Sequence, residues 1–107
     1  MPLFVVCWCM GLFAVVFRVE FHIPVVHSLK EKRGVIKPVI DGLKNRFNVS
    51  VAETDFQDLW QRCEIGIGVV ASSASHAQDV IDECDRFVWS FPEITVTSSQ
   101  TQWLESD

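Results

Sequence analysis

The sequence predicts an α+β domain, a ferredoxin-like βαββαβ sandwich in which a four-stranded antiparallel sheet carries two helices on one face. Two observations lead to this class: four stretches alternate apolar and polar residues as strands do, and two amphipathic stretches with helical spacing lie between them. A chain of 107 residues that is 49 % apolar and 21 % charged fits a single folded domain with one core.

The first predicted strand spans residues 12–23 and ends at Pro24. Its odd positions from Val15 to Ile23 are apolar and predict the buried face. We assign residues 1–10 to an apolar N-terminal extension and residues 11–107 to the single domain. We expect no membrane insertion, because the uncharged run has no basic start or cleavage site and continues directly into a strand.

The first helix is predicted to begin at Ser28, because Ser28 and Glu31 have the spacing of a capping box. It runs to Phe47, although Pro38 lies inside it and should kink it. Five apolar residues share one helical face and predict its contact with the core: Leu29, Ile36, Ile40, Leu43 and Phe47.

The next two strands are predicted to form a hairpin. Residues 48–53 and 59–71 alternate apolar and polar side chains, and the turn-rich residues 54–58 connect them. On the third strand this alternation places Leu59 on the core face and Trp60 on the opposite face.

A second helix and a fourth strand complete the order. Ser73 or Ser75 caps the helix, Ser75 and Gln78 form a second capping box, and Pro92 terminates the helical spacing. The fourth strand, residues 93–103, is rich in Thr, Ser and Gln.

The four cysteines indicate neither disulfides nor a metal site. Cys7 and Cys9 are too close for an ordinary disulfide and lack the Cys-x-x-Cys spacing of a zinc site, whereas Cys63 and Cys84 occupy apolar core positions. The three histidines have no ligand spacing, and no nucleophile motif is present. We therefore expect a cytoplasmic, non-enzymatic protein that needs no cofactor and binds no metal.

The net charge of −5 conceals one basic segment. Residues 27–47 contain six basic and two acidic side chains, a net charge of +4, so the remainder carries −9. Three of these cations lie in the first turns of the predicted helix, where the helix dipole disfavours positive charge. A local field of this kind steers partners more than the average charge does.

The predicted fold places the start of the first helix, residues 27–33, at the same sheet edge as the hairpin loop, residues 54–58. Two interpretations are open. The hairpin acids could neutralise the cations in surface pairs worth ~0–1 kcal/mol each, or the helix-start amides and cations could form an anion site. The residues predicted to bind a nucleic acid or other anion are Lys30, Lys32, Arg33, Lys37, Lys44, Gln57, Gln61 and Arg62. A free nucleoside triphosphate is not expected, because no Gly-rich phosphate loop is present.

The outer face of the sheet is a second candidate surface. It is predicted to carry Arg18, Glu20, His22, Trp60, Arg62 and Glu64. RNA-recognition modules of similar topology stack bases on paired aromatic residues, but Trp60 stands alone here. The alternating charges suit a homodimer better.

Four stretches resemble the YlxP-like family of small bacterial proteins: HSLKEKRGVIKP, NRFNVSVAE, QDLWQRCEIGIGVV and RFVWSFPEI. The resemblance runs from about residue 11 to residue 103. It implies a ferredoxin-like fold and a bacterial cytoplasmic protein whose biochemical function and catalytic residues are not established. The family's genes often lie beside those of translation-initiation and ribosome-maturation factors, which implies a link to ribosomal RNA or ribosome assembly.

We therefore expect a non-enzymatic module that binds ribosomal RNA or a ribosome-assembly factor. Its lysines and Arg33 would contact phosphates, while Gln57, Gln61 and Arg62 would supply shape-specific hydrogen bonds. The alternative is a protein–protein adaptor or homodimer that works through the sheet face. Salt dependence separates the two, because phosphate contacts release counterions.

Overall fold

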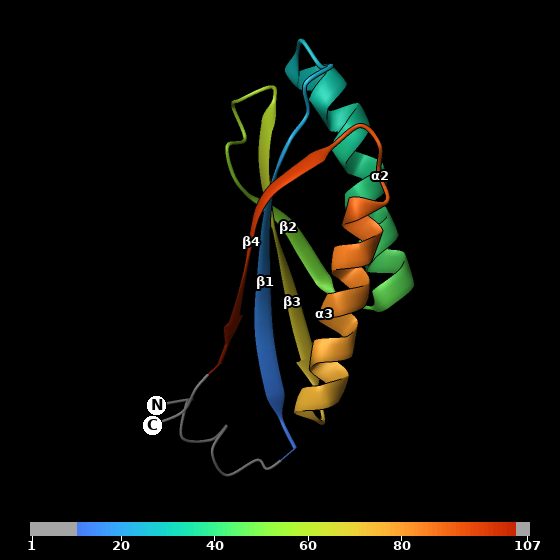
Figure 1. Ribbon diagram of the computed structural model, residues 1–107, viewed down its shortest axis with the longest axis vertical. Helices are drawn as coiled ribbons and strands as arrows, with labels where there is room; N and C mark the ends of the chain where they lie inside the picture. The colour runs from blue at the N-terminus through green and yellow to red at the C-terminus, as the bar shows by residue number, and fades with distance from the viewer. Residues whose placement is uncertain (1–10, 105–107) are drawn as a thin grey trace.

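The computed structural model describes residues 11–104 and confirms the ferredoxin-like fold (Figure 1). The elements are β1 (Phe13–His22), α2 (Leu29–Phe47), β2 (Ser50–Asp55), β3 (Arg62–Ala71), α3 (Ala74–Trp89) and β4 (Thr95–Trp103). The strands form one antiparallel sheet in the order β2-β3-β1-β4, and both helices lie on the same face of it (Figure 1). The predicted extension, residues 1–10, lies outside the described residues.

The core lies between the sheet and the two helices. The odd positions of β1 from Val15 to Phe21 are buried, and so is Ile23 just after the strand, as the alternation predicts. The buried apolar residues of α2 are Ile36, Val39 and Leu43, so the centre of its core-facing side includes Val39.

Two buried thiols belong to this core, which confirms their predicted placement. Cys63 on β3 and Cys84 on α3 are free and buried. Burial raises the pKa of Cys63 to about 12 and that of Cys84 to about 11, so both thiols are protonated at neutral pH.

A glycine allows the two helices to approach each other. A Cβ at Gly42 of α2 would overlap the ring of Phe87 on α3. That ring makes edge-to-face contacts with Phe47 and Phe91, with centroids 5.8 and 5.1 Å away. The aromatic cluster therefore needs a residue without a side chain at position 42.

The structure confirms the predicted cap of α2 and decides between the two caps predicted for α3. Ser28 Oγ accepts a hydrogen bond from the Glu31 amide at 3.1 Å, and a Glu31 carboxylate oxygen accepts one from the His27 amide at 3.3 Å. In α3 the cap is Ser73, whose Oγ accepts from the His76 amide at 3.2 Å.

The second predicted capping box was wrong. Ser75 lies inside α3, and Gln78 donates to Asp82 one turn further along the helix. Gln78 is thus used within the helix surface, where i, i+4 side chains are neighbours.

The sheet edges differ in character. β2 is short, whereas β4 has nine residues and none of its side chains is charged. β4 pairs with β1 on one side, and a register shift separates Glu20 from Phe21 in that pairing.

Candidate functional site

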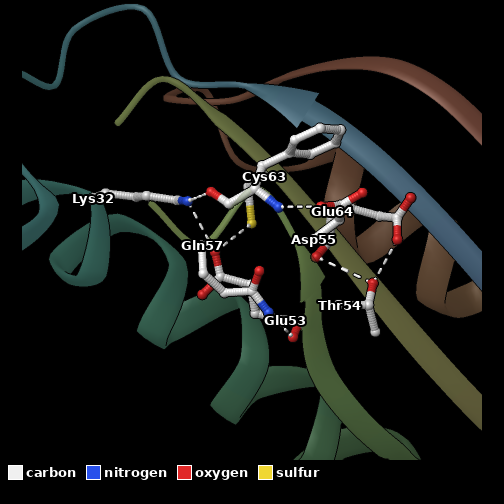
Figure 2. Close-up of polar contacts among 8 residues, drawn as sticks. Lys32, Glu53, Thr54, Asp55, Gln57, Cys63 and Glu64 are labelled. Carbon is white, nitrogen blue, oxygen red and sulfur yellow. Dashed lines mark hydrogen bonds and ion pairs between the residues drawn. The ribbon is translucent and has the colours of Figure 1, made fainter. Parts of the chain in front are cut away.

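The start of α2 and the loop between β2 and β3 lie side by side, as the topology predicts, and Lys32 joins them (Figure 2). The Lys32 Nζ lies 2.8 Å from a carboxylate oxygen of Glu53 and donates a hydrogen bond of 2.7 Å to the carbonyl of Phe56. The residue is only 1 % exposed. Lys32 therefore links the helix to the loop through a buried ion pair and a hydrogen bond.

This burial corrects the role predicted for Lys32. Its ammonium group faces the interior and already has two partners, so it does not reach a phosphate on the surface. For Lys32, the interpretation in which hairpin acids neutralise the helix cations is correct. The pair is buried, which makes its loss far more costly than that of a surface pair.

The same carboxylate contacts a thiol. Cys63 Sγ lies 3.7 Å from Glu53 Oε2 (Figure 2). Burial, and next the negative charge of Glu53, raise the pKa of Cys63, so the thiol stays protonated and donates to the carboxylate. A thiol held in this form is inert as a nucleophile.

The loop backbone is fixed by contacts around Phe56. This residue has φ of +63°, a left-handed conformation that is uncommon for a bulky side chain. Its amide donates to Asp55 Oδ1 at 2.7 Å, and its carbonyl also accepts from the Leu59 amide at 3.0 Å. The Arg62 guanidinium stacks on its ring, 3.8 Å from the centroid.

The two predicted glutamines also hold this region together. Gln57 Nε2 donates to the Glu53 carbonyl at 3.3 Å. Gln61 Nε2 donates to the carbonyls of Pro24 and Val26 at 3.2 and 2.9 Å, which ties the loop to the segment between β1 and α2. Their amide groups therefore position two loops.

The predicted start of the third strand was wrong. The Gln61 carbonyl accepts from the Ile23 amide at 2.9 Å, and β3 begins only at Arg62. Leu59 lies in the loop, 47 % exposed, instead of in the core. The loop spans residues 56–61, and we call it the tip loop.

Arg62 lies on the outer face of the sheet. Its Nε donates to Glu20 Oε2 at 2.6 Å, which raises the pKa of Arg62, and half of its side chain is exposed. A second cross-strand pair, Arg18 with Glu64 at 3.7 Å, lies beside it. The predicted outer face is confirmed for these charged residues.

Four of the predicted cations remain on the surface of α2. Lys30, Arg33, Lys37 and Lys44 are exposed and form what we call the basic stripe. Lys37 pairs with Asp41 at 2.8 Å, a hydrogen bond that raises the pKa of Lys37. Among residues 11–104, the structure gives the other three no hydrogen-bonded or ion-paired partner.

A hollow of about 540 Å³ opens beside the tip loop. We call it the tip pocket, and its lining residues are His22, Asp58, Leu59, Trp60, Gln61 and Arg62. Trp60 is 50 % exposed there. Gln61 and Arg62 were among the predicted binding residues, whereas Asp58 and Leu59 were not, although all four belong to the QDLWQR stretch.

Within the part of the chain that the structure describes, no three His, Cys, Asp or Glu side chains gather as a metal site. No helix between residues 11 and 104 is long and apolar enough to cross a membrane.

Residues 14–101 match the family described as "Protein of unknown function (DUF503)". The chain belongs to this family. It is also 43 % identical to "Uncharacterized protein YlxP" of Bacillus subtilis (strain 168) over 77 residues, which are 72 % of this chain and 84 % of that protein. These matches confirm the resemblance seen in the sequence, and the family's function is unknown.

Solved structures agree with the fold. A de novo designed protein with ferredoxin fold, LFR1 1, aligns with a TM-score of 0.50 and 18 % identity over 83 % of this chain and 84 % of its own. The Bacillus subtilis YXEP protein, a dinuclear metal binding peptidase from the M20 family, aligns with a TM-score of 0.50 and 12 % identity over 87 % of this chain and 26 % of its own. At these identities the likeness shows the fold alone.

Proposed function

We propose that this DUF503 protein is a non-enzymatic module of the bacterial cytoplasm that binds structured RNA of the ribosome or of its assembly intermediates. The observation that carries the proposal is the basic stripe: Lys30, Arg33 and Lys44 are exposed, without partners among the described residues, on a chain that is otherwise acidic. Exposed cations on one helix neutralise phosphates and release counterions, which supplies most of the affinity for RNA.

The predicted residues fall into two groups. Lys30, Arg33, Lys37 and Lys44 are exposed and would contact phosphates, and the half-exposed Arg62, paired with Glu20, lines the tip pocket. The other group consists of Lys32, Gln57 and Gln61, which hold the tip loop against the start of α2. A rigid loop beside a basic helix can recognise RNA by shape, as RNA-binding modules do.

The test is co-sedimentation with ribosomes and direct binding to ribosomal RNA at several salt concentrations. We expect wild-type affinity to fall steeply with salt. Lys30→Ala/Arg33→Ala should lower the slope of log K against log [salt] by about 1.5, from two lost phosphate contacts. The control is Arg18→Ala/Arg86→Ala, which removes the same charge away from the stripe. Equal losses in both double variants, or no wild-type binding at any salt, would refute the proposal.

A second candidate function, homodimerisation through the outer sheet face, is favoured by an apolar groove. The groove measures about 730 Å³, and its outward residues include Val16, Val70 and Leu104, all exposed. The other half of the face carries two arginines paired with two glutamates, so a second copy would meet no net charge. A self-complementary patch of this kind fits a two-fold interface.

Sedimentation velocity tests this second candidate. A dimer that dissociates on Val70→Glu, but not on Val25→Glu at an exposed position outside the groove, would support it. A wild-type protein that stays monomeric across the concentration range would refute it.

A further inference from the structure

The tip pocket combines an aromatic surface with polar groups on a fixed backbone. Trp60, which is half exposed, lines the pocket together with Asp58 and Arg62. Lys32, Gln61 and the stacked Phe56 hold the loop that carries Trp60. An exposed tryptophan on a loop with this many anchors is a preorganised contact surface.

The chemistry of the pocket suits a nucleobase. Proteins that read single-stranded RNA stack splayed-out bases on aromatic rings or on arginine planes and bind their Watson–Crick edges with polar side chains. Trp60 offers the stacking surface, and Asp58 offers the edge contact.

The carboxylate of Asp58 determines which base fits. An ionised carboxylate only accepts hydrogen bonds. Guanine presents two adjacent N–H donors, N1–H and the 2-amino group, to a carboxylate. Adenine and cytosine place an acceptor nitrogen next to their single amino group, and uracil flanks its one N–H with two carbonyls, so each would leave a carboxylate oxygen facing another acceptor.

We propose that the tip pocket takes one unpaired guanine of the bound RNA, stacked on Trp60 and hydrogen-bonded through its Watson–Crick edge to Asp58. This assignment rests on the RNA-binding function proposed above and names the nucleotide that it recognises. The phosphates on either side of the guanine are expected to extend toward the start of the basic stripe. Because the flanking phosphates add contacts to those of the base, we expect the RNA to bind more tightly than free GMP.

The experiment measures fluorescence anisotropy of three labelled single-stranded RNAs. The strands are uridine-rich and differ at one central position, which is guanine, hypoxanthine or adenine; GMP is titrated separately. We expect wild-type protein to prefer the guanine strand over the adenine strand by roughly 10-fold, in line with a two-bond base contact. The hypoxanthine strand, which lacks the 2-amino group, should lie between them.

Three variants in the pocket and one control outside it assign the effect to the pocket. Trp60→Ala should weaken binding of the guanine strand by about 5- to 150-fold, the range for loss of one stacked base. Trp89→Ala is the matched control, because that indole is 60 % exposed but lies on α3 outside the pocket. Asp58→Asn should abolish the preference for guanine while Trp60→Phe keeps most of the affinity. Circular dichroism confirms that each variant is folded.

The outcomes separate the two proposals. RNA binding that depends on Lys30 and Arg33 but is unchanged in Trp60→Ala, or that shows no preference for guanine, would overturn the pocket and leave the basic stripe intact. GMP binding as tightly as the guanine strand would overturn the pocket as an RNA site. No binding of ribosomal RNA by the wild type would overturn the proposed function, and the pocket with it.

Discussion

Lys32 offers the sharpest test of how this domain is held together. The substitution Lys32→Met keeps most of the apolar stem but removes the ammonium group that joins α2 to the tip loop. It leaves the Glu53 carboxylate, whose side chain is 22 % exposed, and the Phe56 carbonyl without their shared donor. The domain should therefore lose stability mainly through the Glu53 carboxylate, which loses its cation, since the Phe56 carbonyl still accepts from the Leu59 amide.

The magnitude follows from the burial of the pair. Removing one partner of a buried ion pair costs ~3–5 kcal/mol. Because Glu53 keeps some contact with water, we expect the lower end, about 3 kcal/mol. A domain of this size has roughly 5–14 kcal/mol of stability in total, and a loss of about 3 kcal/mol lowers Tm by roughly 10–25 °C.

Urea unfolding followed by tryptophan fluorescence measures the loss. A double-mutant cycle with Glu53→Gln isolates the pair: Lys32→Met/Glu53→Gln should be more stable than the sum of the two single losses by about 1–3 kcal/mol, because the buried charge is gone. The reasoning fails if Lys32→Met is within about 0.5 kcal/mol of wild type, or if the two losses simply add.

Two further predictions concern the core. Gly42→Ala should destabilise the domain by about 1 kcal/mol, because overlap with the Phe87 ring outweighs the better helix propensity of alanine. Gly34→Ala meets no neighbour within 4 Å and should stabilise the domain by up to about 1 kcal/mol. Equal effects of the two substitutions in urea unfolding would contradict this reasoning. The raised pKa values of about 12 for Cys63 and about 11 for Cys84 predict stability that is full below pH 9 and falls above it, since the unfolded chain releases thiol protons that the folded chain retains. The slope is at most about 1.4 kcal/mol per pH unit for each thiol, and Cys63→Ala/Cys84→Ala should remove it in unfolding measured from pH 8 to 10.

The fold was predictable because its signals are local. Alternation on β1 and helical spacing on α3 each extend over ten or more residues, which makes the period unambiguous. The order of the elements then restricts the topology. The start of the third strand was not predictable, since the apolar pattern continues through Leu59, whereas the structure has a loop there in which Gln61 donates to the carbonyls of Pro24 and Val26.

The candidate site was predictable in place but not in detail. The topology alone brought the helix start and the hairpin loop together. The buried position of Lys32 had a signal, because it lies four residues before Ile36 and eleven before Leu43 on the core-facing side of α2. Its partner had none, because Glu53 and the Phe56 carbonyl approach Lys32 only after the sheet and helix pack together.

The contacts of Lys32 affect how the tip loop can open. Lys32 joins the helix to a carbonyl 24 residues away, so the tip loop cannot open while the first turn of α2 stays docked. Segments that share such a contact unfold locally as one cooperative unit. The amide protons of Leu59, in the tip loop, and Ile23, bonded to Gln61 at its end, should therefore exchange with solvent at a common rate set by release of the helix start. The time that the tip loop, which carries Trp60, stays in its closed conformation is therefore set by how often the start of α2 detaches.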